Sequence, residues 1–295
     1  PISNGNLNVP GRGKVMNVVS PFDGISGAQV ALGRAGFKVD NYFALEVDKY
    51  AVAITQANYP STVQLGDVTK LNFNAVHADL LIGGSPCQGF SFAGKQLNFD
   101  DPRSKLFWEF VRLKNELKPK YFLLENVRMK QEYQDVISEA LGVEPININS
   151  NLVSAQNRNR YYWTNIPVDG MPKDKGITWG DIREYDAPIS HYYSKGGLSW
   201  MERHSKRTGK KLRIWSDDDK CQMLEASMYK NYSGQRFFAI DDTEGLRYIS
   251  LLECERAQTV PDNYSDHVSN TQRYKMLGNG FTVDVIAHIL KGIKS

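Results

Sequence analysis

Hydrophobic positions in the first half of the chain form short β-rich runs that alternate with stretches of helical periodicity. The helical stretches are Gly27–Arg34, Tyr50–Ala57 and Lys105–Leu117. The predicted strands are Val15–Ser20, Tyr42–Val47, Val63–Leu65, Leu80–Gly83, Tyr121–Glu125, Pro145–Ile148 and Tyr161–Thr164. Strands that alternate with helices are typical of βαβ units, so we expect an α/β fold with a doubly wound, mostly parallel sheet.

The periodic pattern stops after Pro167 and returns near residue 247. The stretch between is rich in Gly, Pro, Ser, Tyr and charged residues, which indicates a small irregular lobe. Beyond it the pattern predicts a helix over Arg247–Gln258, a turn over Pro261–Tyr264 and an amphipathic helix over Val283–Lys291. The chain therefore divides into a main domain, 14–166, the irregular lobe, 167–246, and a C-terminal segment, 247–295, that returns to the main domain.

Composition narrows the class of protein. No apolar run reaches the roughly 18 residues of a membrane span, and the first residues lack a signal-peptide pattern, so we expect a cytoplasmic protein, or a nuclear one in a eukaryote. Three widely separated cysteines without a C-x-x-C pair argue against a disulfide framework or a zinc site, and we expect no metal. The net charge is only +3, but the stretch 191–213 holds seven Lys and Arg residues against one acid.

Three successive strand ends carry candidate ligand-binding residues. The first strand runs into Phe22-Asp23-Gly24-Ile25-Ser26-Gly27, Glu46 ends the second, and Asp67 follows the third. Neither a G-x-G-x-x-G spacing nor a P-loop lysine is present, so this order suits an adenosyl ligand without phosphates. Each feature has a plainer interpretation, because the Gly turn can be only a tight connection and strand-end acids are often simply solvated.

The fourth strand runs into a Gly- and Pro-rich loop that contains Cys87. A lone cysteine is usually a small buried hydrophobe, but one at the carboxyl end of a central strand faces the ligand crevice and is a candidate nucleophile. Glu125 ends the fifth strand and lies beside Cys87 if the two strands are neighbours; otherwise it can cap the next helix. Strand alternation puts Arg158 and Arg160 on one face, which suits a phosphate or carboxylate partner, or merely a solvated edge.

Taken in order, these motifs resemble those of the DNA cytosine-5 methyltransferases. The resemblance covers roughly Val15–Ile166 and Arg247–Leu290. It rests on Phe22-Asp23-Gly24, Glu46, Asp67, Pro86-Cys87-Gln88, Glu125-Asn126-Val127, Gln156 to Arg160 and Leu277-Gly278-Asn279-Gly280. Two departures bear on the cofactor contacts: Ser26-Gly27-Ala28 stands where many members have a Gly pair, and Gly280-Phe281 replaces the common Ser-Val.

The resemblance implies a Rossmann-like methyltransferase fold, a reaction and a cofactor. Cys87 would attack C6 of a flipped-out cytosine, Glu125 would bind the ring, Arg160 would hold the base and Glu125, and Arg158 would support Cys87 or a phosphate. The implied cofactor is S-adenosyl-L-methionine, converted to S-adenosyl-L-homocysteine. Its expected contacts are Phe22, Asp23, Gly24, Ile25, Gly27, Glu46, Val47, Asp67, Val68, Pro86, Leu106, Asn279 and Phe281.

The same resemblance makes the irregular lobe the target-recognition segment and double-stranded DNA the partner. The implied DNA contacts are Gln88, Ser91, Arg203, Lys206, Arg207, Lys210, Lys211 and Arg213. The basic stretch can also be an ordinary solvated surface. Two other functions stay open: methylation of cytosine in transfer RNA by the same fold, which the sizeable lobe disfavours, and a DNA-binding relative without activity, which the intact Cys87, Glu125 and Arg160 disfavour. The DNA sequence recognised, the biological role (restriction-modification, phage protection or epigenetic marking) and the oligomeric state are not readable from the motifs.

Overall fold

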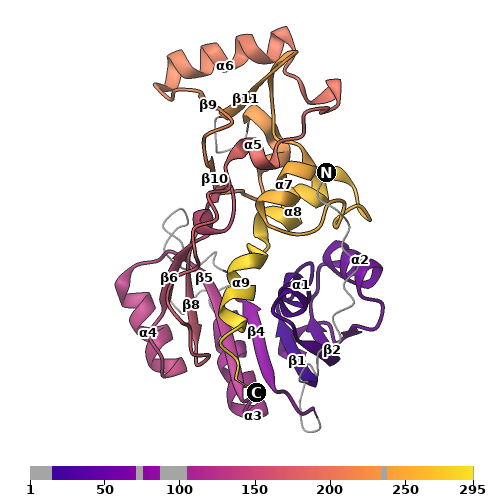
Figure 1. The fold of residues 1–295 in the computed structure, drawn as a ribbon, viewed down its shortest axis with the longest axis vertical. Helices are drawn as coiled ribbons and strands as arrows, with labels where there is room; N and C mark the ends of the chain where they lie inside the picture. The colour runs from indigo at the N-terminus through magenta and orange to yellow at the C-terminus, as the bar shows by residue number, and fades with distance from the viewer. Residues whose placement is uncertain (1–14, 71–75, 87–104, 234–237, 295) are drawn as a thin grey trace.

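The computed structural model describes residues 15–70, 76–86, 105–233 and 238–294. A seven-stranded sheet lies at its centre, in the order β3-β2-β1-β4-β5-β8-β6 (Figure 1). The strands are β1 Val15–Pro21, β2 Lys38–Leu45, β3 Val63–Gln64, β4 Leu80–Gly84, β5 Tyr121–Val127, β6 Ile146–Asn149 and β8 Asn159–Thr164. Strands β1 to β5 pair in parallel, whereas β8 is antiparallel to both neighbours, so the predicted mostly parallel α/β fold is confirmed.

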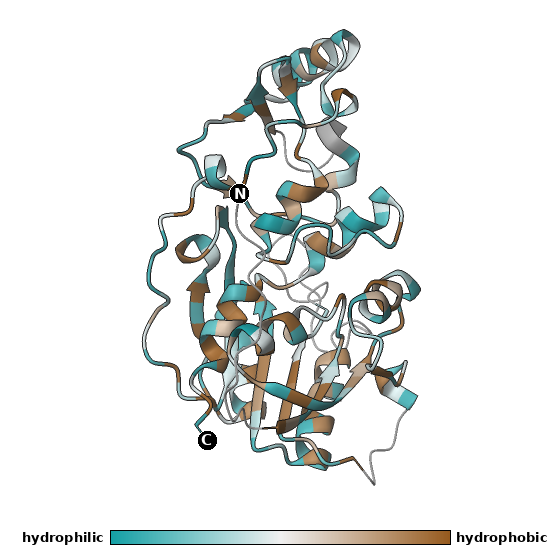
Figure 2. Cartoon of the chain, turned by 45° about the vertical axis from the view of Figure 1, so that its right-hand side comes forward, coloured by the Kyte–Doolittle hydropathy of each residue, from teal (hydrophilic) through white to brown (hydrophobic). Residues whose placement is uncertain are grey.

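Both faces of the sheet are buried. Val18 of β1 belongs to the core cluster that includes α1 and α9, and the next residue, Val19, belongs to the cluster that includes α3 and α4. Successive strand residues point to opposite faces, so this alternation identifies two core layers. The helices are α1 Gly27–Arg34, α2 Lys49–Asn58, α3 Lys105–Leu117, α4 Gln131–Leu141 and α9 Val283–Leu290. The hydrophobic residues of the central strands stand out in brown in Figure 2.

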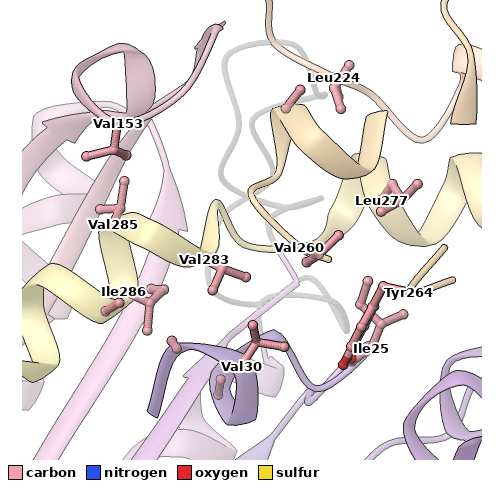
Figure 3. Packing of buried hydrophobic residues seen from close by; sticks show 14 of the residues in the cluster. Ile25, Val30, Val153, Leu224, Val260, Tyr264, Leu277, Val283, Val285 and Ile286 are labelled. Carbon is pink, nitrogen blue, oxygen red and sulfur yellow. The ribbon is translucent and has the colours of Figure 1, made fainter. Parts of the chain in front are cut away.

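The last segment of the chain closes the first core layer. Helices α7 Leu251–Ala257 and α8 Asn270–Asn279 precede α9, which packs against α1. Figure 3 shows Val283 and Ile286 of α9 facing Val30 of α1, with Val285 facing Val153. The predicted closing helix is therefore confirmed, and it packs on the first core layer of the sheet.

The middle segment forms a small lobe beyond the sheet (Figure 1, top). It contains α5 Trp179–Ile182, α6 Lys195–Thr208, β9 Arg213–Trp215, β10 Cys221–Gln222, β11 Phe238–Asp242 and β12 Gly245–Arg247. A three-stranded sheet, β12-β11-β9, packs Trp215 onto Phe238, and β10 pairs instead with β7 Gln156–Asn157 of the main domain. Short 3-10 turns are η1 Val68–Lys70, η2 Ser150–Leu152, η3 Ile189–His191 and η4 Met228–Ser233. Helix α6 was not predicted, because the sequence pattern of this segment indicates an irregular lobe.

The prediction of a helix from Arg247 was wrong at its start. Arg247 ends strand β12, and α7 begins only at Leu251, after a capping box between Ser250 and Glu253. The reason is a buried ion-pair network: Arg247 donates from both terminal nitrogens to Glu253, at 2.7 and 3.0 Å, and from Nε to Asp242 at 2.5 Å. Arg183 joins the network through Asp242 at 3.1 Å. These contacts tie the lobe to α7.

Strands β1 and β4 approach too closely at one point for any side chain. A Cβ atom on Gly83 would lie 2.3 Å from the carbonyl oxygen of Pro21. Glycine is therefore required where the chain leaves the sheet toward residue 87. No helix within the described ranges is long and apolar enough to cross a membrane.

We predict that Arg247→Met lowers the free energy of unfolding by about 3–5 kcal/mol, because it leaves the carboxylates of Glu253 and Asp242 buried without a cation. Urea unfolding followed by circular dichroism measures the change. The control is Lys130→Met, which removes an exposed pair with Glu132 and should cost at most about 1 kcal/mol. Equal stability of the Arg247→Met variant and the wild type would contradict the role given to this network.

Candidate active site

A cavity of about 390 Å³ lies at the carboxyl end of the parallel strands. This volume is within the range of small-molecule sites. Nine of the predicted cofactor residues line it, namely Phe22, Asp23, Gly24, Ile25, Gly27, Glu46, Pro86, Asn279 and Phe281. Glu125, Arg158 and Arg160 line it as well, so the segments that follow β1 and β2 meet residues of β5, β8 and the end of α8 in one place.

The turn after β1 has a fixed shape. Phe22, Gly24 and Ser26 all have positive φ angles, of 57°, 59° and 56°. One carboxylate oxygen of Glu46 accepts a hydrogen bond from the Gly24 N–H at 2.9 Å, and the other accepts from the N–H groups of Val47 and Asp48, each at 2.8 Å. Glu46 therefore holds the glycine turn against the end of β2. At Gly24 a Cβ atom would meet no other atom within 4 Å, so the backbone borders open space.

Asp23 is buried in the wall of the cavity. The Tyr42 hydroxyl donates to its carboxylate at 2.5 Å, and the Ser26 hydroxyl donates to the other oxygen. Burial raises the pKa of Asp23 to about 6, even though the hydrogen bonds from Ser26 and Tyr42 act in the opposite direction. The Asp23 carboxyl group therefore stabilises the turn through its hydrogen bonds, and it titrates at about pH 6.

Four predicted cofactor residues are not part of the cavity lining: Val47, Asp67, Val68 and Leu106. Val47 is 73% exposed, and Val68 is buried in the second core layer, against which Leu106 also packs. Asp67 accepts hydrogen bonds from the N–H and hydroxyl of Thr69, and these bonds lower its pKa. Its carboxylate therefore caps the turn η1 in this structure.

The central charged pair joins Glu125 of β5 and Arg160 of β8. Parallel pairing of β4 and β5 sets Glu125 opposite Gly84, which confirms that the fourth and fifth strands are neighbours. The Nε atom of Arg160 lies 2.8 Å from the Glu125 carboxylate, and the side chains are only 8% and 14% exposed. Arg160 also donates to the backbone oxygen of Asn159 at 2.9 Å. A carboxylate held in this way at a cavity wall is oriented toward whatever occupies the cavity.

Arg158 has structural partners. Its terminal nitrogens donate to the backbone oxygens of Leu224 at 3.1 Å, Gly278 at 3.3 Å and Gly280 at 3.0 Å. Arg158 thus joins the lobe segment to the end of α8. It shares the cavity lining with Arg160, as strand alternation predicted.

Cys87, Gln88 and Ser91 lie outside the described residues. The chain can be followed to Pro86, which lines the cavity. Directly before it, the buried Ser85 hydroxyl accepts a hydrogen bond from the Asn126 carboxamide at 2.9 Å. The amide oxygen of Asn126 in turn accepts from the Val127 N–H at 2.8 Å. The ends of β4 and β5 are therefore fastened together one residue ahead of Pro86.

Sequence reasoning missed several residues of the lining, including Asp48, Ala51, Gly84, Ser85 and Met276. Gly278 also lines the cavity, and a Cβ atom on it would lie 2.2 Å from the backbone of Glu225. Gly278 could have been predicted as a lining residue, because it belongs to the Leu277-Gly278-Asn279-Gly280 motif. Within the described ranges no cluster of three His, Cys, Asp or Glu side chains could hold a metal ion.

A second, larger cleft of about 1110 Å³ separates the main domain from the lobe. Of the predicted DNA-binding residues that the structure describes, only Arg213 lines it. Arg203, Lys206 and Arg207 lie on α6 at the tip of the lobe (Figure 1), and Lys210 and Lys211 follow it as exposed residues. Lys206 pairs with Glu202 at 2.7 Å. The basic stretch is therefore spread along the lobe.

The sheet order, with an antiparallel β8 and a cavity at the strand ends, defines a Rossmann-like methyltransferase fold. The model of the C-5 cytosine-specific DNA methylases matches residues 16–141 and 129–295. The chain is 30% identical to the Type II methyltransferase M.HpaII of Haemophilus parainfluenzae, over 97% of this chain and 90% of that protein. It is 29% identical to M1.ScrFI of Lactococcus lactis subsp. cremoris, over 91% and 75% of the two chains.

A crystal structure of a putative DNA modification methyltransferase encoded within a prophage of E. coli has the same fold. Its TM-score is 0.70 at 23% identity, over 94% of this chain and 98% of that one. The protein belongs to the C-5 cytosine-specific DNA methylase family. The prediction of a DNA (cytosine-5)-methyltransferase is therefore confirmed, and DNA is favoured over transfer RNA as the substrate.

We predict a pH-dependent contribution of Asp23 to stability. Its pKa is raised from 3.8 to about 6 on folding, so its contribution is greatest below pH 3.8 and is lost as the pH rises through about 6. The free energy of unfolding of the wild type, relative to Asp23→Asn, should fall by roughly 1–2 kcal/mol between pH 5 and pH 7.5. Urea unfolding of both proteins at several pH values tests this; a difference that does not vary with pH would contradict it.

Proposed function

We propose that the protein methylates carbon 5 of a flipped-out cytosine in a specific sequence of double-stranded DNA, with S-adenosyl-L-methionine as donor and Cys87 as the covalent nucleophile. The observation that supports this most strongly is the Glu125–Arg160 ion pair, 2.8 Å long, in the wall of the cavity that Pro86 also lines. Cys87 follows Pro86 directly in the sequence, so it is the cysteine that we propose for reaction at this cavity.

The proposed chemistry follows from the weakness of cytosine as a nucleophile at C5. The Cys87 thiolate adds to C6, while Glu125 hydrogen-bonds N3 and the exocyclic amine, and Arg160 keeps Glu125 in place. The ring then has enamine character and C5 can form the new carbon–carbon bond. Loss of the C5 proton to water, with expulsion of Cys87, restores the aromatic ring. Arg158 acts through the backbone that it holds.

The cavity suits S-adenosyl-L-methionine, which when bound supplies an electrophilic methyl group. The Gly24 backbone borders open space, and the Glu46 carboxylate lies at the end of β2, where an acid can bind a ribose hydroxyl pair. Phe281 lies against Gly27, with 3.7 Å between its Cδ2 and a Cβ placed on that glycine, and provides an aromatic wall. Contacts from Val47, Asp67, Val68 and Leu106 remain predictions.

We assign the larger cleft to duplex DNA. C5 and C6 of a stacked cytosine are inaccessible, so the base must leave the helix to reach Glu125. The cleft and the cavity share Val127, Arg160, Gly278 and Asn279, which gives an extruded base a continuous path. In this proposal 14–166 is the catalytic and cofactor-binding domain, 167–246 recognises the target, and 247–295 completes the catalytic domain.

The similarity to enzymes named Type II methyltransferases favours a role in a restriction-modification system within a bacterial cytoplasm. The alternative that the protein is a DNA-binding relative without activity is disfavoured, because the Glu125–Arg160 pair is intact. Methyl transfer to duplex DNA, single-stranded DNA and transfer RNA, measured with labelled cofactor, separates the substrates. The proposal expects incorporation into duplex DNA, in the form of 5-methylcytosine.

We predict that Cys87→Ala lowers turnover by about 10⁴-fold or more, because no other thiol takes over the nucleophilic step. DNA binding in a gel-shift assay should remain close to the wild type. Cys221→Ala is the matched control: Cys221 is fully buried, which raises the pKa of its thiol, so turnover should change little. Unchanged turnover of Cys87→Ala would overturn the assignment.

We predict that Glu125→Gln and Arg160→Met each lower the single-turnover rate of methyl transfer by about 10²–10⁴-fold, because both disturb the group that binds the reacting ring. The double variant should lose little more than either single variant, since the two side chains act as one unit. Lys175→Met, which breaks an exposed pair with Asp284, serves as the control. Additive losses in the double variant would contradict this coupling.

A further inference from the structure

Among the buried polar atoms of the large cleft that make no hydrogen bond in the described structure, two belong to neutral amides. The Nε2 donor of Gln222 and the Oδ1 acceptor of Asn159 make no hydrogen bond, and both residues line the cleft. A buried polar atom that stays unsatisfied destabilises the protein, and most such atoms in native proteins have a partner. A ligand that enters the cleft can supply the missing partners.

Neighbouring polar groups in the same cleft are already occupied. Lys220 donates to the backbone oxygens of Asn151 at 2.7 Å, Ser154 at 3.3 Å and Ile177 at 2.6 Å. Arg160 is held by Glu125. Lys220 and Arg160 therefore stabilise the walls of the cleft. The amides of Gln222 and Asn159 can still form hydrogen bonds with a ligand.

The two amides lie near the Glu125–Arg160 pair, Asn159 at the start of β8 and Gln222 on β10. Arg160 donates to the backbone oxygen of Asn159 at 2.9 Å and lies 3.2 Å from the sulfur of Met223, which follows Gln222. Gln222 is also fixed in place, because β10 pairs in parallel with β7 and sets Gln222 opposite Asn157. A group on a hydrogen-bonded strand is positioned well enough to discriminate between ligands.

We propose that Gln222 and Asn159 determine the DNA sequence that is methylated, by reading base edges beside the target cytosine. The inference rests on the proposed function. Rotation about its terminal torsion turns the Gln222 amide toward an acceptor on a base, such as a purine N7 or O6 or a thymine O4. Asn159 accepts from an exocyclic amine of adenine or cytosine. DNA contacts of this kind satisfy both orphaned atoms at once.

The test is methylation of a duplex library with randomised bases around cytosine, read by bisulfite sequencing. Wild type should yield a defined motif. Gln222→Ala and Asn159→Ala should each still form 5-methylcytosine, with preference at one base position relaxed by about tenfold or more. Gln131→Ala, on the exposed surface of α4, is the matched control and should leave the motif unchanged.

Gln222→Glu replaces a donor with an acceptor at nearly constant size, so it should shift the preferred base at that position toward one that carries an amine. An unchanged motif in all three cleft variants would overturn the inference. So would a uniform loss of rate on every sequence together with a lower melting temperature, which is the behaviour of a packing residue. Absence of 5-methylcytosine with the wild type would instead refute the proposed function, so the two failures are distinguishable.

Discussion

The ion pair between Glu125 and Arg160 is the interaction on which the site depends. It exists because β5 pairs in parallel with β4 and antiparallel with β8, so that a carboxylate and a guanidinium from sequence-distant strands meet at 2.8 Å. Both side chains are almost fully buried, and an unpaired charge there would be costly. The topology of the sheet therefore determines the charge distribution in this wall of the cavity.

Three sets of contacts around this pair determine the shape of the cavity. Glu46 fixes the glycine turn on one side, Arg158 joins the lobe to α8 on the other, and the Ser85–Asn126 bond fastens the strand ends in between. The partners of Glu46 and Arg158 in these contacts are backbone groups, and the Ser85–Asn126 bond joins two neutral side chains. The cavity and the cleft meet at Arg160, which links the groups that would bind the cofactor to those that would bind DNA.

The sequence allowed the main sheet to be predicted because its apolar runs are uninterrupted and its helices are amphipathic; α1 and α3 have the predicted bounds. Helix α8 was missed because its inward face includes Arg273, whose charge is neutralised by Glu255, so no apolar stripe is visible. The predicted start of a helix at Arg247 was wrong for a similar reason, because the charge of this buried residue is neutralised by Glu253, which lies in α7. Gln222 could not be found from the sequence, since its place in the same cleft as Arg160 depends on the pairing of β10 with β7.

The proposed reaction requires that the thiol of Cys87 form a bond to an extruded cytosine beside Glu125. The most direct measurement is incubation of the wild type with S-adenosyl-L-methionine and duplex DNA that carries 5-fluorocytosine at the target base, followed by denaturing electrophoresis and peptide mass spectrometry. Fluorine cannot leave as a proton does, so we expect a covalent complex that resists denaturation and maps to Cys87. No complex, or an adduct on another residue, would contradict it.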